Sequence, residues 1–401
     1  SIGVYQLHIN RIIASDAEIN RNRLISQGRV PVYNIESPAD FPEIKPGTVI
    51  IDALFGSGLS RPVEGLPAEL VGHLNRSGCR IISIDIPSGL MGEDNAGNAE
   101  KGIIRASDTL TFQFPKRSFF YAENEKFTGR WHILPIGLHP AILSEKPAGF
   151  HFVGEDDAVL KIAERRRFSH KGTFGHALLI AGSYGMAGAA ILAARACMRS
   201  GAGLLTTHLP RLLYPIVQVA VPESIFSIDT SEKFFSVCPD VGKFTAIAAG
   251  PGIGILQQTR DALEVLLKNA RSPLVLDADA LNILASHSDL LGNLPENTII
   301  TPHPGEFDRL TGHTGNGYSR NLTQIEFSKK FKLIIVLKGA FTSVTMPDGR
   351  CYFNGTGNPG MSTAGSGDVL TGIILSLLAQ GYTSGDAAVS GTFLHGLAGD
   401  L

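Results

Sequence analysis

The amino-acid sequence predicts an α/β protein of two domains, each built around a mostly parallel sheet. Short apolar runs alternate with segments in which apolar residues recur at helical spacing. Glycine is abundant, with 45 residues, as expected for a fold with many tight strand-to-helix turns. The length of 401 residues is typical of two domains. Together these features predict alternating strands and helices.

The composition excludes several classes of protein. It is 43% hydrophobic and 18% charged, as in an ordinary globular enzyme. The formal net charge of −2 provides no basic field, which argues against a nucleic-acid partner. No apolar run reaches the roughly 18 residues of a membrane span. The four cysteines are widely spaced and no secretory signal is recognisable, so we expect a cytoplasmic protein.

The first predicted domain, residues 1–140, contains a strand, a helix and a second strand in that order. This order predicts a βαβ unit, whose parallel strands end at one edge of the sheet, near Gly56 and Pro87. Residues 137–150 are irregular and rich in proline and glycine, and we place the domain boundary there. The expected elements are Thr48–Leu54, Leu66–Leu74, Arg80–Ile86, Asp108–Phe114 and Trp131–Ile136.

The second predicted domain, residues 150–401, repeats the strand–helix rhythm on a larger scale. A β-hairpin is expected near its end, turning at Pro347-Asp348-Gly349. The expected strands are His176–Ala181, Leu204–Leu209, Thr245–Ala249, Pro273–Leu276, Thr298–Thr301, Leu333–Leu337, Ser343–Met346 and Cys351–Phe353. The expected helices are Ala187–Ser200, Gln257–Lys268, Leu322–Lys330, Asp368–Gln380 and Gly385–Ala398.

The most informative segment is Thr363–Asp368, a glycine-rich turn that leads into an amphipathic helix. Small residues let a ligand approach the backbone, and the start of a helix offers unpaired N–H groups to an anion. Asp368, in the first helical turn, is a candidate base for a substrate hydroxyl. The alternative is a capping aspartate with glycines that only make a turn. A second flexible stretch, Gly355–Gly360, favours a ligand loop.

Four further segments each follow a predicted strand, so they are expected at the same sheet edge. Gly250–Gly254 would let a substrate approach the backbone, and Asp277-Ala278-Asp279 suits Mg²⁺ or a polar substrate unless Asp279 simply caps the next helix. In Thr301–Glu306, two prolines hold His303 in place, although a loop histidine is more often a bystander. Lys338 can reach a phosphate, although a solvated surface lysine is the commoner case.

These motifs together resemble one family. Gly357–Gly372, Thr301–Glu306, Leu276–Asn282 and His170–Gly175 resemble the carboxyl-terminal dehydratase domain of the NAD(P)H-hydrate repair family, which has a ribokinase-like fold. The resemblance covers essentially all of residues 150–401. It implies that Asp368 is the catalytic acid/base at the hydrated nicotinamide. It implies an adenine-nucleotide site at Lys338, Gly339, Ala340, Phe341, Thr342 and Gly367, and contacts to the hydrated dinucleotide from Ala177, Gly252, Gly254 and His303, with Gly252 the favoured glycine.

The first domain resembles the epimerase of the same family, a Rossmann-like domain, through Ile51–Pro62 and Ser83–Gly89. The resemblance implies Asp52 and Ser88 near a potassium ion and Asp85 at the reacting ring, although Asp85 could also merely anchor its loop. It places Gly56, Ser57, Gly58, Leu59, Ser60, Arg61 and Pro62 around the dinucleotide phosphates. The family's Asn-Asn-Gly-Gly-Asp loop is not found, and its expected place lies before Ser1. We therefore expect this domain to lack its first segment.

The sequence thus predicts a bifunctional repair enzyme. One domain would interconvert the R and S hydrates of NADH or NADPH, and the other would dehydrate the S form with ADP or ATP and Mg²⁺. A homo-oligomer is expected by resemblance. Two alternatives stay open: a ribokinase-like kinase of a vitamin precursor with a non-catalytic first domain, and a first domain that is a binding module for RNA. The near-neutral charge argues weakly against RNA.

Overall fold

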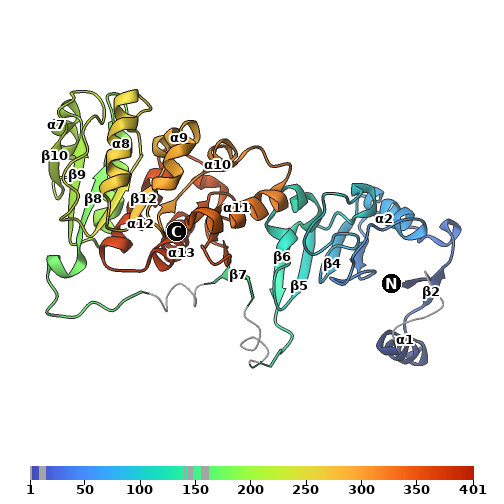
Figure 1. Cartoon of the computed structure of the whole chain (residues 1–401). Helices are drawn as coiled ribbons and strands as arrows, with labels where there is room; N and C mark the ends of the chain where they lie inside the picture. Colours follow the sequence, from blue (N-terminus) through green and yellow to red (C-terminus); the bar gives the residue numbers. More distant parts are fainter. Residues whose placement is uncertain (1, 9–14, 140, 142–147, 155–161) are drawn as a thin grey trace. The chain divides into compact units, whose positions relative to one another are not determined.

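The computed structural model describes residues 2–8, 15–139, 141, 148–154 and 162–401. The chain divides into two compact units, Ser1–Lys146 with Asn316–Tyr318 and Pro147–Gly315 with Ser319–Leu401 (Figure 1). Half of the predicted boundary at residues 137–150, namely residues 140 and 142–147, lies outside the described residues. Among the helices of the described part, none is long and apolar enough to cross a membrane.

The first unit contains a four-stranded parallel sheet in the order β3-β4-β5-β6. Leu70, Val71 and Leu74 of the crossover helix α2 pack with Ile81 of β4 in a small core. A separate pair of parallel strands, β1 and β2, accompanies the helix α1. The elements are β1 (Val4–Leu7), α1 (Ser15–Gln27), β2 (Val32–Ile35), β3 (Val49–Asp52), α2 (Leu66–Arg76), β4 (Arg80–Ile84), β5 (Asp108–Phe112), α3 (Glu125–Thr128) and β6 (Arg130–Leu134).

The second unit is built on a ten-stranded sheet in the order β10-β9-β8-β11-β12-β13-β14-β15-β16-β7. The pairs from β10 to β14 are parallel, and β14, β15 and β16 are antiparallel neighbours. The strands are β7 (Phe150–Val153), β8 (His176–Ile180), β9 (Leu204–Leu209), β10 (Ile225–Ile228), β11 (Ala246–Ala249), β12 (Leu274–Leu276), β13 (Ile299–Ile300), β14 (Ile334–Leu337), β15 (Ser343–Thr345) and β16 (Cys351–Asn354).

Helices cover both faces of this sheet and form two cores (Figure 1). Ala177 and Leu179 of β8 pack with α6, α12 and α13, whereas the alternate residues Leu178 and Ile180 pack with α8 and α9. The helices are α6 (Ala187–Arg199), α7 (Tyr214–Ala220), α8 (Gln257–Asn269), α9 (Asp279–Ser286), α10 (Pro304–Thr311), α11 (Gly317–Phe331), α12 (Ser366–Ala379) and α13 (Ser384–Asp400).

The predicted fold class is confirmed, and most predicted elements lie within two residues of the observed ones. The exception among the predicted helices is α11, which begins at Gly317, five residues before the predicted start at Leu322. The expected hairpin is formed by β15 and β16. The sequence patterns did not reveal α1, β2, α3, β7, α7, β10, α9 and α10, and all of these except α1 have eight residues or fewer. The missed strands have four residues each, too few for a periodic pattern to stand out.

Candidate active sites

The glycine-rich turn delivers Asp368 to the first turn of α12. The N-cap residue is Gly365, whose φ of 91° lies in the left-handed region that glycine tolerates. A side chain there would also collide with Leu192 of α6, because an added Cβ would lie 2.3 Å from its Cδ1. At Gly367, an added Cβ would lie 3.3 Å from Lys338 Nζ. The glycines therefore let the backbone of the turn lie close to Leu192 and Lys338.

Asp277 connects the end of β12 to two other elements. Its carboxylate is buried and accepts hydrogen bonds from Lys338 Nζ at 3.0 Å and from Thr371 Oγ1 of α12 at 2.7 Å. Ala278, which follows, has a φ of 49°, a strained conformation for a residue other than glycine. This turn separates Asp277 from Asp279 and starts α9. The predicted proximity of Asp277, Lys338 and the α12 start is thus seen in the structure.

The surroundings of Asp368 weaken its acidity. Burial is the main cause and the negative charge of Asp277 adds to it, and together they raise the pKa of the Asp368 carboxyl to about 6. The nearby Lys338 ammonium acts in the opposite direction but does not cancel them. A carboxylate whose pKa lies close to neutral is well matched to accept a proton. Asp368 therefore has the electrostatic properties of a general base.

Backbone contacts join the other predicted loops at this sheet edge. Gly182 N donates to Pro251 O at 2.8 Å, and Lys338 N donates to Pro302 O at 2.9 Å. Gly254 N donates to Asp279 Oδ2 at 2.9 Å, so the Asp279 side chain holds the glycine loop and does not cap its own helix. The loops after five strands therefore form one continuous rim, as their positions after parallel strands predict.

His303 is held in place as predicted, and its own side chain contributes to that. It is the N-cap of α10, and its Nδ1 accepts hydrogen bonds from Gly305 N at 3.0 Å and from Glu306 N at 3.3 Å. Because Nδ1 is an acceptor, the ring proton of the neutral imidazole lies on Nε2. The side chain is 52% exposed, and its Nε2 lies 3.6 Å from Glu306 Oε1.

One predicted contact residue does not reach the rim. Ala177 is fully buried and lies at the amino end of β8, packed in the core. The residues that do reach the rim from this strand are those of the segment Gly182–Met186 after it. A Cβ added to Gly252 would lie 3.1 Å from the Cβ atoms of Met186 and Ala189. This segment was not predicted, although Ser183-Tyr184-Gly185 follows a predicted strand, as the other loops of the rim do.

His395 of α13 is a second residue that the analysis missed. Its Nε2 lies 3.3 Å from Ser366 Oγ, at the first residue of α12. Burial lowers the pKa of the His395 imidazole, the backbone of Ser366 partly offsets this, and the charge of Lys338 lowers it further. The ring is therefore neutral at physiological pH. No sequence signal separated this helix histidine from an ordinary core residue.

In the first unit, Asp85 directly follows β4. Its Oδ1 lies 2.7 Å from Lys116 Nζ and its Oδ2 accepts a hydrogen bond from Ser57 N at 3.2 Å. Burial acts to raise the pKa of the Asp85 carboxyl, but the hydrogen bond and charge of Lys116, with the Ser57 N–H, outweigh it and leave the pKa below its ordinary value. Asp85 is thus an ionised acceptor at neutral pH.

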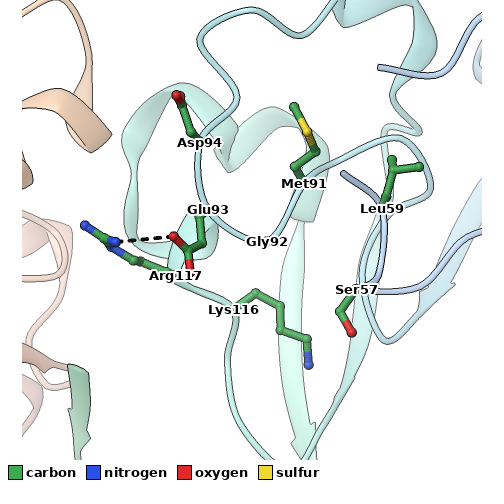
Figure 2. A pocket seen from close by; sticks show the side chains of 8 residues that line it. All are labelled: Ser57, Leu59, Met91, Gly92, Glu93, Asp94, Lys116 and Arg117. Atoms are coloured by element: carbon green, nitrogen blue, oxygen red, sulfur yellow. Dashed lines mark ion pairs between the residues drawn. The ribbon is translucent and has the colours of Figure 1, made fainter. Parts of the chain in front are cut away.

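A cavity of about 440 Å³ is lined by Ser57 and Lys116, which both contact this carboxylate (Figure 2). Its lining includes Ser57 and Leu59 of the predicted phosphate loop, and Lys116. The loop itself is largely exposed, including Gly56, Gly58, Ser60 and Arg61. The structure therefore places part of the predicted loop and the partner of Asp85 around one cavity. The other lining residues are Met91, Gly92, Glu93, Asp94 and Arg117.

Asp52 and Ser88, the predicted potassium ligands, contact each other. The Asp52 carboxylate is 2% exposed and accepts hydrogen bonds from Ser88 N, Ser88 Oγ and Ser83 Oγ at 2.6 to 2.8 Å. Among the residues that the structure describes, no basic side chain forms an ion pair with it. A buried carboxylate with only neutral donors favours a cation, and these oxygen ligands suit a hard one. The residues therefore fit the ion.

Comparisons with known proteins agree with this arrangement. A family model described as NAD(P)H-hydrate dehydratase matches residues 177–401, and a model described as YjeF-related protein N-terminus matches residues 1–118. The bifunctional NAD(P)H-hydrate repair enzyme of Moorella thermoacetica is 34% identical over 362 residues, which are 88% of this chain and 68% of the relative. That of Thermofilum pendens is 35% identical over 365 residues, with the same two coverages.

Two solved structures resemble the second unit. The ADP/ATP-dependent NAD(P)H-hydrate dehydratase of Bacillus subtilis, co-crystallised with ATP and Mg²⁺, is 34% identical with a TM-score of 0.55, and the match covers 61% of this chain and 87% of that one. A ribokinase-like superfamily protein of Enterococcus faecalis is 28% identical with a TM-score of 0.55, covering 64% and 89%. The fold of the second unit is therefore ribokinase-like. From these matches and the rim of loops, the chain belongs to the family of bifunctional NAD(P)H-hydrate repair enzymes.

Proposed function

We propose that the second unit dehydrates the S form of NADH or NADPH hydrate with ADP or ATP as the phosphate donor. The single observation that carries this proposal is the position of Asp368. It is a carboxylate with a pKa of about 6, in the first turn of a helix whose glycine-rich start lies beside Lys338. These features support a base next to a site for an anion.

In the proposed mechanism, the Asp368 carboxylate accepts the proton of the ring hydroxyl, whose oxygen attacks the terminal phosphorus of the nucleotide. The bond from that phosphorus to its bridging oxygen breaks, which releases AMP from ADP or ADP from ATP. N–H groups at the start of α12 stabilise the transferred phosphoryl group. Phosphate then leaves the ring carbon more easily than hydroxide would. A proton leaves the neighbouring ring carbon and the ring double bond re-forms. His303, whose side chain is 52% exposed, would orient the hydrated dinucleotide.

The nucleotide site would lie at Lys338–Thr342 and Gly367. Thr342 Oγ1 lies 3.3 Å from Gly339 N and 3.2 Å from its carbonyl oxygen, so this loop is preformed. Mg²⁺ would shield the phosphate charges when the nucleotide is bound. No group of three or more His, Cys, Asp or Glu side chains that could hold a metal ion is found in the described part of the chain. The ion would therefore arrive with the phosphates.

We propose that the first unit interconverts the R and S hydrates. Asp85 would exchange a proton with the reacting ring from the edge of the cavity, and the loop Gly56–Pro62 would hold the dinucleotide phosphates. Potassium would be held by Asp52 and Ser88, beside the same loop. The alternative is a loop-anchoring role for Asp85 alone; the proposal is favoured because Ser57 and Lys116, which contact Asp85, line a cavity of about 440 Å³.

One experiment tests the dehydratase and its kinase alternative together. The whole chain is incubated with either ADP or ATP and with NADH hydrate or, in a parallel sample, a vitamin-like alcohol. Absorbance of the reduced ring is followed while products are separated. Recovery of NADH with release of inorganic phosphate supports repair. A stable phosphorylated product from a vitamin-like alcohol, without recovery of NADH, would support the kinase. The ADP and ATP arms show which nucleotide is used.

Three further properties are part of the proposal. The four cysteines are free thiols, which fits a reducing cytoplasm. The exposed apolar side chains of Ile216 and Val219 on α7, 55% and 83% accessible, favour a homo-oligomer, which light scattering on the purified protein would test. The formal charge of −2 gives no reason to expect nucleic acid, and RNA binding measured over a range of salt concentrations would test this.

A further inference from the structure

Two neighbouring strands of the first unit end in the same tight turn. After β4, Asp85 has a φ of 69° and Ile86 N donates to Ile84 O at 2.9 Å. After β5, Gln113 has a φ of 57° and Phe114 N donates to Phe112 O at 2.6 Å. Three-residue turns with a positive φ are rare and strained. Each turn therefore needs contacts from its surroundings to persist.

Lys116 connects these two turns. Its Nζ lies 2.7 Å from Asp85 Oδ1 and donates to Phe112 O and Phe114 O, each at 3.3 Å. Those carbonyls flank the Gln113 turn. An ammonium group has three protons, and these three acceptors use all of them. Lys116 lines the cavity (Figure 2), yet it has no donor left for a substrate phosphate.

The same contact fixes the state of Asp85. The Lys116 ammonium and Phe112 N hold one carboxylate oxygen, at 2.7 and 3.4 Å, and Ser57 N holds the other. The Lys116 ammonium is the charged group that lowers the pKa of the Asp85 carboxyl. The other charged groups that line the cavity are Glu93, Asp94 and Arg117, and two of these, Glu93 and Arg117, form an ion pair with each other at 3.5 Å.

We propose that Lys116 is a positioning residue of the epimerase site, which ties the Asp85 carboxylate to the strained turn at Gln113 and keeps it aimed and ionised. The ammonium group acts on the acceptor of the ring proton and does not bind the dinucleotide phosphates, which are left to the loop Gly56–Pro62. This inference rests on the proposed epimerase function. It adds a residue that the family resemblance did not supply.

The test compares three variants of the whole chain. Lys116→Met removes the charge and keeps a long side chain, Lys116→Arg keeps the charge, and Lys126→Met removes an exposed lysine paired with Glu100 as a matched control. The carbon-13 signal of the Asp85 carboxyl is titrated in each. In Lys116→Met the midpoint is expected to rise by about one pH unit or more, and Lys116→Arg and Lys126→Met are expected to stay close to the unmodified protein.

Epimerisation is measured in parallel, as its dependence on pH. In Lys116→Met, the acidic limb of the pH profile of kcat/KM is expected to move to higher pH together with the titration midpoint of the Asp85 carboxyl. An unchanged Asp85 titration in that variant would overturn the proposal. So would a raised KM with an unchanged pH profile, which is the result expected of a phosphate ligand. If Lys116→Met does not fold, Lys116→Gln, which also removes the charge, is titrated instead: a raised Asp85 midpoint supports the proposal and an unchanged midpoint contradicts it. If the unmodified chain does not epimerise, the epimerase function fails, and the titration still decides the role of Lys116.

Discussion

Replacing Asp368 with asparagine should abolish dehydration and stabilise the second unit at the same time. The reason is that the folded protein holds this carboxylate in an unfavourable environment. Burial and the charge of Asp277 raise its pKa from the ordinary 3.8 to about 6, although Lys338 offers partial compensation. An amide of the same shape carries no charge to desolvate. It also cannot accept the proton of the ring hydroxyl, so turnover is lost.

The size of the stabilisation follows from the pKa difference. A rise of about two units corresponds to about 3 kcal/mol at neutral pH. Because the carboxyl is only partly buried and solvent screens its charge, we expect about 1 to 2 kcal/mol. The pKa of the Asp368 carboxyl is higher in the folded protein than in the unfolded chain, so protonation of this group stabilises the fold. This stabilisation is complete below about pH 4 and is lost as the pH rises through about 6. The gain of Asp368→Asn should therefore be full near neutral pH and vanish at low pH.

The assay is thermal unfolding followed by calorimetry at several pH values, with dehydratase activity measured on the same samples. Asp289→Asn is a matched control, because this carboxylate is 71% exposed and lies 3.8 Å from Arg260. It should change stability by less than about 0.5 kcal/mol. A lower unfolding temperature in Asp368→Asn near neutral pH, or a gain that does not depend on pH, would refute the electrostatic reasoning. Near-normal turnover would refute the catalytic role.

Three further outcomes are expected. Dehydratase kcat should fall about tenfold for each pH unit below about 6, and Asp277→Asn should move this limb to lower pH in a pH–rate profile. Gly250→Ala should lower the unfolding temperature strongly, because its Cβ would lie 1.9 Å from Asp277 O, whereas Gly254→Ala, with open space around it, should cost about 1 kcal/mol. Ser88→Ala should cost about 1 to 3 kcal/mol in chemical unfolding, because it removes a hydroxyl donor from the buried Asp52 carboxylate; an unchanged midpoint would contradict this.

The sequence predicted the rim of the second unit well because simple geometry governs it. Asp277 and Lys338 each follow a parallel strand, so their proximity, 3.0 Å between Oδ1 and Nζ, follows from strand direction. Strand direction also explains the one misplaced residue. Ala177 stands at the amino end of β8, the end opposite the loops, and its side chain enters the core.

The contacts that escaped prediction depend on local backbone shape and on long-range packing. The role of Lys116 arises because two turns with positive φ, at Asp85 and Gln113, bring carbonyl and carboxylate oxygens together. Neither residue is glycine, so composition gives no sign of such turns. His395 reaches Ser366 only through the packing of α13 against α12, which no sequence spacing reveals.

The pairing of β7 with β16 has a consequence for synthesis of the chain. Phe150–Val153 finds its partner in Cys351–Asn354, about 200 residues later. At ribosomal speeds of about 5 to 20 residues per second, this strand is made about 10 to 40 seconds before the strand that it pairs with. During that interval its backbone has no hydrogen-bonding partner on that side. The sheet of the second unit can be completed only after residues 351–354 have emerged, so a nascent chain stalled before residue 351 should present this segment to chaperones.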